Sequence, residues 1–147
     1  MKSISLTLPY PISANRYWAT RVVMPKGGGR PMSMTYVTPE AKAYKREVGW
    51  LCKAAGIRGP IKSKVALSFR LVPANGVCMD LDNCLKVAID SLKDIAFLDD
   101  SQVYKITAER HMPDGRARLE VVIEEYVPPP AGLFALQQER EPDKVPF

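Results

Sequence analysis

Two kinds of apolar periodicity alternate along this chain, and they limit the folds that it can adopt. Residues 4–8 alternate apolar and polar positions, as a half-buried strand does, and strand patterns return in residues 64–73 and on both sides of Pro113–Gly115. Residues 39–55 and 83–96 instead place apolar side chains every three to four positions, as amphipathic helices do. The order β, α, β, α, β, β predicts an α/β or α+β fold, with a small mixed sheet packed against two main helices.

The first of these helices has clear boundary signals. Thr38 can cap its N-terminus, Pro39 suits the first helical position, and Gly56 ends it. Its basic residues lie largely off the apolar stripe; they are Lys42, Lys45, Arg46 and Lys53. They form either a solvated face or a surface that meets phosphate groups, and the pattern leaves both readings open. Earlier in the chain, the run Gly27–Gly29 predicts a flexible loop or the tip of a loose hairpin.

Length and composition indicate a single globular domain. The chain has 147 residues, of which 46% are hydrophobic, enough for a substantial core. It has no apolar run of the length that spans a membrane and no apolar region typical of a secretion signal near the N-terminus, so we expect a cytoplasmic protein with no membrane partner. We assign residues 1–127 to the domain and the proline-rich residues 128–147 to an extended or partly disordered C-terminal extension.

The rare residue types exclude several kinds of chemistry. His111 is the only histidine, which excludes a zinc site built from two histidines of one chain and disfavours a Ser-His-Asp triad. Cys52, Cys78 and Cys84 form no CxxC pair, so we expect reduced, structural thiols. Any catalysis must therefore depend on carboxylates and lysines.

Charge is distributed unevenly along the chain. Residues 1–79 contain thirteen lysines and arginines and two acidic residues, whereas residues 80–147 contain eight and fourteen. Such asymmetry within a small domain predicts a polyanionic partner for the basic part. The acidic part needs a separate explanation, because phosphate and carboxylate groups repel each other unless a cation lies between them.

Much of the acidic charge lies between residues 79 and 103. The aspartates of this stretch are Asp80, Asp82, Asp90, Asp94, Asp99 and Asp100. Asp80 and Asp82 flank Leu81, and in an extended segment residues two apart point to the same side. We therefore expect both carboxylates to face one site while Leu81 anchors the turn in the core.

Lys86 follows Asp82 by four positions, so its ammonium can reach the same place. Asp90 is four positions further on, and an ion pair with Lys86 is the simple explanation for it. Either Asp99 or Asp100, directly after the helix, can supply a third carboxylate, and spacing alone does not select one of them. Three carboxylates suit Mg²⁺ or Mn²⁺, which bind oxygen ligands and bridge to phosphates. A solvated helix with capping aspartates explains the same pattern without a metal.

The compound pattern "DLDNCLKVAIDSL" followed by "FLDDSQV" resembles the RusA family of Holliday-junction resolvases, and "LPYPISANRYW" resembles the N-terminal segment of that family. The resemblance covers about residues 4–126. It implies a Mg²⁺-dependent endonuclease that nicks four-way DNA junctions symmetrically as a homodimer, in DNA recombination and repair. On matching positions it implies that Asp80, Asp82 and Asp100 hold the metal, with Mn²⁺ able to substitute, and that Lys86 assists catalysis.

Two other readings remain open at this point. The chain can be a non-catalytic nucleic-acid-binding protein whose acidic cluster is structural, or a DxD nucleotide-sugar transferase, for which it is short. For a homodimer, the apolar strands in residues 65–71 or 119–123 offer material for the interface.

Overall fold

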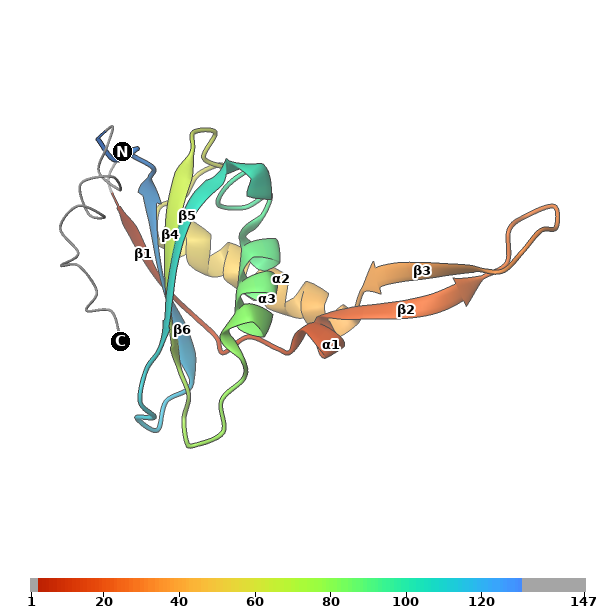
Figure 1. Ribbon diagram of the computed structural model, residues 1–147, viewed down its shortest axis with the longest axis horizontal. Coiled ribbons are helices and arrows are strands. Elements are labelled where there is room, and N and C mark those ends of the chain that lie inside the picture. Colours follow the sequence, from red (N-terminus) through yellow and green to blue (C-terminus); the bar gives the residue numbers. More distant parts are fainter. Residues whose placement is uncertain (1–2, 131–147) are drawn as a thin grey trace, which may run out of the picture.

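The structure is a computed structural model that describes residues 3–130. In chain order its elements are β1 (Ile4–Leu8), α1 (Ala14–Tyr17), β2 (Trp18–Val23), β3 (Met32–Val37), α2 (Pro39–Ala54), β4 (Val65–Val72), α3 (Leu81–Leu92), the 3₁₀ helix η1 (Asp100–Gln102), β5 (Val103–Arg110) and β6 (Arg118–Glu125). Figure 1 shows a sheet with α2 and α3 on one face and a two-stranded arm, β2–β3, that extends away from the body. The predicted α+β class is confirmed.

The main sheet has the strand order β1-β6-β4-β5 and is mixed. β4 and β5 are parallel neighbours, while β6 runs antiparallel to both β1 and β4. A parallel pair needs a crossover connection, and here that connection contains α3 and η1. The topology therefore places α3 against one face of the sheet and returns the chain to β5 beside it.

The core lies between that face of the sheet and the two long helices. Phe69 of β4 pairs with Val121 of β6, and both are almost fully buried, as are the other inward residues of these strands. α2 contributes Ala41, Tyr44, Val48 and Cys52, and α3 contributes Cys84, Val87, Ala88, Ser91 and Leu92. The suggestion that residues 65–71 or 119–123 supply a dimer interface is wrong for their apolar side chains, because the monomer core already buries them.

Two expected helices are present, with one shift. Thr38 caps α2 as predicted, accepting a hydrogen bond from the backbone N–H of Ala41 at 3.2 Å. The second helix is Leu81–Leu92 rather than 83–96, so it starts and ends earlier than the apolar spacing indicated. Lys93 then adopts an extended conformation that ends the helix, and Asp94 after it has a positive φ of 66°.

The arm and α1 were not predicted as regular structure. β2 and β3 form a continuous antiparallel ladder from the pair Trp18–Val37 to the pair Val23–Met32. The loop between them includes Gly27, Gly28 and Gly29, all with positive φ, which glycine adopts without a steric penalty. The expected hairpin tip is therefore present, but on a well-formed ribbon.

No helix within residues 3–130 has the length and apolar character needed to cross a membrane. The predicted C-terminal extension, residues 128–147, falls outside the described residues from position 131 onward.

The three cysteines differ in burial, which gives a test of the fold. Cys52 and Cys84 are fully buried, and burial raises their thiol pKa to about 11 and about 12, so little thiolate forms at pH 8. Cys78 is only half-buried. We expect a thiol reagent such as Ellman's reagent to modify one cysteine quickly in the native protein and all three in denaturant. Cys78→Ser should abolish the fast phase, and a fast phase that persists in this variant would contradict the packing of α2 or α3.

Candidate active site

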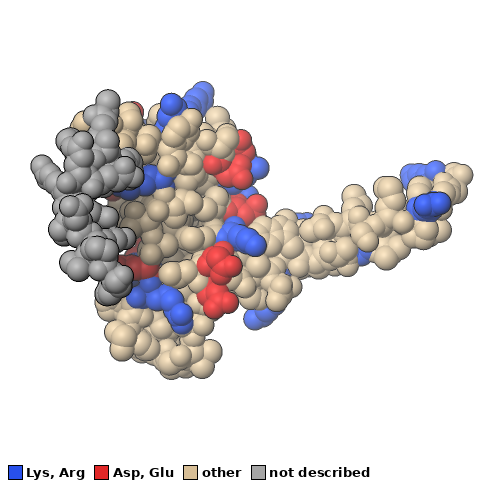
Figure 2. Space-filling model, viewed as in Figure 1, with Lys and Arg blue, Asp and Glu red and all other residues tan. Residues whose placement is uncertain are grey.

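One side of α3 carries a row of charged residues, of which Asp82 and Lys86 are exposed and Asp90 is half-buried. Asp82, Lys86 and Asp90 follow one another at four-residue spacing and so lie one turn apart on the same face. Lys86 and Asp90 line a hollow of about 450 Å³, which Asp100 of η1 and apolar residues of β5 close on the other side. Figure 2 shows acidic and basic groups gathered on this face, beside the base of the arm. The structure thus brings two of the predicted site residues, Lys86 and Asp100, into one hollow.

Asp80 and Asp82 lie at the N-terminal end of the same helix. Asp80 is the N-cap residue and Asp82 is in the first turn, so the expectation that both belong to one extended segment is wrong, while the expectation that their carboxylates face one site stays a prediction. Both side chains are exposed, and the Asp80 carboxylate makes no capping hydrogen bond. Neither carboxylate takes part in an ion pair within residues 3–130. They stand at the positive end of the helix dipole, available to a ligand.

The two adjacent aspartates after α3 have different surroundings. Asp99 caps η1 through a reciprocal box with Gln102, accepts a 2.6 Å hydrogen bond from the Ser101 hydroxyl, and lies 3.6 Å from the Lys93 ammonium. The hydrogen bond from Ser101 is the largest cause of the lowered pKa of Asp99. Asp100 is exposed and lines the hollow. Asp99 is thus held by hydrogen bonds within η1 and by Lys93, whereas Asp100 lies in the hollow of the candidate site.

The predicted ion pair between Lys86 and Asp90 does not form within the described residues. The Asp90 carboxylate instead accepts a hydrogen bond from the hydroxyl of Tyr17, a fully buried residue. Burial, reinforced by Asp90, raises the pKa of Tyr17, so its hydroxyl stays protonated and remains a donor. The Lys86 ammonium consequently keeps its charge available for an incoming anion.

Within residues 3–130, no three acidic, histidine or cysteine side chains come close enough together to enclose a metal ion. The donor chemistry nevertheless fits Mg²⁺. This ion is usually held by one or two carboxylates together with substrate phosphates and waters, rather than by a cage made entirely of protein. Asp80, Asp82 and Asp100 offer exposed oxygen ligands of this kind, and their assignment as metal ligands stays a prediction.

Residues that sequence reasoning missed hold α3 in place. The Tyr10 hydroxyl accepts a 2.9 Å hydrogen bond from the backbone N–H of Met79, just before the helix. Asn83 Oδ1 accepts a 2.6 Å hydrogen bond from the backbone N–H of Ala14, the first residue of α1. With the Tyr17–Asp90 bond, the segment from residue 10 to residue 17 is joined to α3 at its entry, first turn and third turn. Spacing along the sequence gave no sign of these contacts, because more than sixty positions separate the partners.

Comparison with known proteins gives a consistent picture. The sequence profile of the family described as endodeoxyribonuclease RusA matches residues 9–124. The chain is 32% identical over 130 residues to the crossover junction endodeoxyribonuclease RusA of Escherichia coli (strain K12) and to that of Shigella sonnei (strain Ss046). These matches cover 85% of this chain and 97% of each relative. The corresponding protein of Enterobacteria phage HK97 is 25% identical over 124 residues, covering 82% of this chain and 95% of the relative.

The bond between Asn83 and Ala14 can be tested by stability. Asn83→Ala leaves a half-buried backbone N–H without its acceptor, so we expect the free energy of unfolding in urea to fall by about 1–3 kcal/mol. Asn15→Ala makes the same change at an exposed position of α1 and should cost much less. Equal losses for the two variants would show that Asn83 does not hold α1 to α3.

Proposed function

The chain belongs to the RusA family of endodeoxyribonucleases, and on that premise we propose that it resolves four-way (Holliday) DNA junctions by paired, symmetric nicks that depend on Mg²⁺, in DNA recombination and repair. One observation carries the proposal. Lys86 and Asp100 line the same hollow beside α3. Two carboxylates that no described residue engages lie at the N-terminus of this helix, Asp80 at the N-cap position and Asp82 in the first turn. The names of the relatives, which describe crossover junction endodeoxyribonucleases, support this choice of substrate.

Asp80, Asp82 and Asp100 would hold the divalent metal, with Mn²⁺ able to replace Mg²⁺. Such a metal lowers the pKa of a bound water and neutralises charge on the phosphate that is attacked. The remaining tasks belong to the chain's own residues. Lys86 contacts a phosphate oxygen and stabilises the negative charge that grows on it as the bond breaks. Its exposed position in the hollow, with no ion pair to a described residue, suits that role.

The apolar part of the hollow orients the strand. Trp18, Ile89 and Val103 line it together with the charged groups. Ile89 and Val103 offer no hydrogen bonds to a phosphate, so they restrict the backbone of the DNA to the charged side and limit the water around it. The strand is thereby aligned along α3 with a phosphate between Lys86 and Asp100.

A non-catalytic DNA-binding protein remains the second candidate function. It is favoured by the position of Asp80 and Asp82 at the N-terminus of α3, where negative charge stabilises a helix without any metal. Against it, the Asp80 side chain makes no capping hydrogen bond. A purely structural aspartate at an N-cap position is expected to bond to the backbone of the first turn.

A homodimer is part of the same proposal, since one described domain offers one such hollow and symmetric nicking needs two. The β2–β3 arm supplies a surface for it. One face of the arm presents Met32, Met34 and Tyr36 at 62%, 52% and 41% exposure, and a two-stranded ribbon is marginally stable alone in water. The same face carries Arg21, whose guanidinium lies 5.4 Å from the centre of the Tyr36 ring, and the other face carries Val22 with Thr20, Ser33 and Thr35. We propose that the faces of two arms that carry Met32, Met34 and Tyr36 cover each other about a two-fold axis.

This arrangement links formation of the dimer to the position of the active sites. Trp18 begins the arm and also lines the hollow that contains Lys86 and Asp100. Pairing of the arms would therefore hold two active sites in a fixed relation, as symmetric cleavage of one junction requires.

Asp80→Asn should abolish cleavage of a labelled four-way junction in Mg²⁺, while binding of the junction in EDTA persists. The substitution keeps the shape of the side chain and removes a charge from the metal site. Affinity for DNA depends mainly on lysine and arginine contacts to phosphates, which the substitution leaves in place. Asp114→Asn, at an aspartate in the β5–β6 loop, is the matched control and should cleave normally. Cleavage at the wild-type rate by Asp80→Asn in saturating Mg²⁺ would contradict the site.

Met32→Glu should convert the homodimer into a monomer in sedimentation experiments, because it places a charge opposite Val23 on the face of the arm that carries Met34 and Tyr36. Thr35→Glu adds the same charge on the opposite face and should leave the dimer intact. A wild-type protein that stays monomeric both free and on the junction would contradict the dimer. Dissociation by both variants, or by neither, would exclude this face as the interface.

A further inference from the structure

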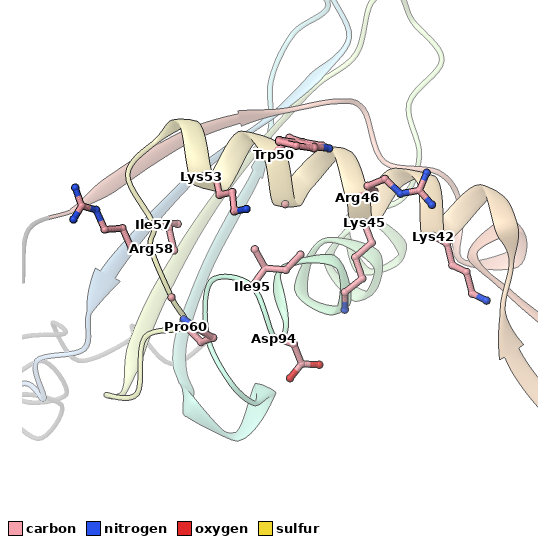
Figure 3. Close-up of a pocket in the computed structure, with 12 residues that line it drawn as sticks. Lys42, Lys45, Arg46, Trp50, Lys53, Ile57, Arg58, Pro60, Asp94 and Ile95 are labelled. Atoms are coloured by element: carbon pink, nitrogen blue, oxygen red, sulfur yellow. The ribbon is translucent and has the colours of Figure 1, made fainter.

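A second hollow lies on the other flank of the C-terminal end of α3. α2 forms one wall, the segment 57–60 that follows it forms the second, and Asp94 and Ile95 close the floor. Its volume is about 570 Å³. Figure 3 shows Ile95 near the middle of this space, with Arg58 at one end and Lys42 at the other.

Trp50 stands out in this hollow because it is 67% exposed. A large aromatic side chain left in water on α2 contributes little to the core, whose stripe on this helix consists of Ala41, Tyr44, Val48 and Cys52. Beside Trp50, Gly49 has no side chain, and a Cβ placed there would come within 3.5 Å of Ile95 Cδ1. The backbone of α2 therefore lies close to the floor of the hollow at this position, one residue before Trp50.

The charges around this ring are almost all positive. The hollow is lined by the basic residues Lys42, Lys45, Arg46, Lys53 and Arg58, with Asp94 as its one carboxylate. None of the five cations makes an ion pair with another residue of the described chain. Lys53 places its ammonium 5.7 Å from the centre of the Trp50 ring, and the Lys45 ammonium donates to the backbone carbonyl of Asp90 at 3.1 Å. The surface therefore combines an open aromatic face with unneutralised positive charge.

We propose that this hollow, the α2 groove, binds a short segment of single-stranded DNA, with one unpaired base stacked on Trp50 and the flanking phosphates on the surrounding lysines and arginines. Exposed aromatic rings among basic groups are how proteins hold single strands. A duplex keeps its bases stacked inside the helix and could use only the charges, so neither the exposed indole nor the apolar floor would contact a base. From Lys42 to Lys53 the helix extends about 16 Å, enough for several phosphates.

The α2 groove rests on the proposed function in one respect, namely that DNA is the substrate. It adds a place for an unpaired part of that substrate beside the cleavage site. Asp90 and Lys93 line the first hollow, and the next residues, Asp94 and Ile95, line the groove. A strand that leaves base pairing near the cleaved phosphate would reach Trp50 around the end of α3.

The direct test is the affinity of the full-length protein for a labelled oligothymidine, measured by fluorescence anisotropy in EDTA. Trp50→Ala should weaken binding by about 5- to 150-fold, which corresponds to about 1–3 kcal/mol for stacking of one base. Trp50→Phe retains an aromatic ring and should keep most of the affinity. Wild-type affinity in Trp50→Ala would overturn the proposal, as would an equal loss in Trp50→Phe.

Charge gives a second, independent readout. Lys42→Ala and Lys53→Ala should each reduce the slope of log affinity against log salt concentration by about 0.7, the value for one contact to single-stranded DNA. Lys105→Ala, on the opposite face of the sheet, should leave the slope unchanged. Equal slopes for all three variants and the wild type would overturn the assignment of phosphates to the groove.

The test also distinguishes single-strand binding in the groove from the proposed cleavage of junctions and from binding of a second copy of the chain. Oligothymidine contains no junction and EDTA removes divalent ions, so loss of junction cleavage in Asp80→Asn has no bearing on the result. If Trp50→Ala instead sediments as a smaller species than the wild type and binds oligothymidine normally, the groove holds a second copy of the chain and the proposal fails.

Discussion

The attachment of the segment around residues 10–17 to α3 is the interaction on which the candidate site depends. Three hydrogen bonds join Tyr10, Ala14 and Tyr17 to the entry, the first turn and the third turn of the helix, and they fix its position against the sheet. The same segment leads directly into Trp18 and the arm. One short stretch of chain therefore sets the orientation of the helix that carries the charged row and the starting point of the ribbon beside it.

The parallel pairing of β4 and β5 provides the other half of the site. Because the crossover between these strands contains α3, the chain must return to the sheet close to the helix, and η1 forms at that return. Gln102 holds η1 there, donating to the backbone carbonyls of Ile61 and Ser63 at 2.8 and 2.9 Å. Asp100 therefore lies in the same hollow as Lys86, whereas Asp99 caps η1. The two adjacent aspartates thus have different roles.

Local signals in the sequence were reliable, and long-range ones were absent. Thr38 and Pro39 predicted the start of α2 correctly, since capping depends on adjacent residues. Asp80 occupies the N-cap position of α3, so the helix begins at Leu81 and not at residue 83, where the apolar spacing had placed it. α1 could not be foreseen because its first N–H bonds to Asn83, far along the chain. Spacing left Asp99 and Asp100 equivalent; the resemblance to the family selected Asp100, which lines the hollow, and its role as a metal ligand stays a prediction.

The central claim is that α3 and η1 form one metal-dependent phosphate site. The most direct measurement is the position of Mn²⁺, located by anomalous scattering in a crystal of the protein with a four-way junction. The account predicts an ion bound by carboxylates among Asp80, Asp82 and Asp100, bridging to a DNA phosphate that Lys86 also contacts. A junction phosphate seated against Lys86 with no Mn²⁺ beside it, or Mn²⁺ bound away from all three aspartates, would contradict it.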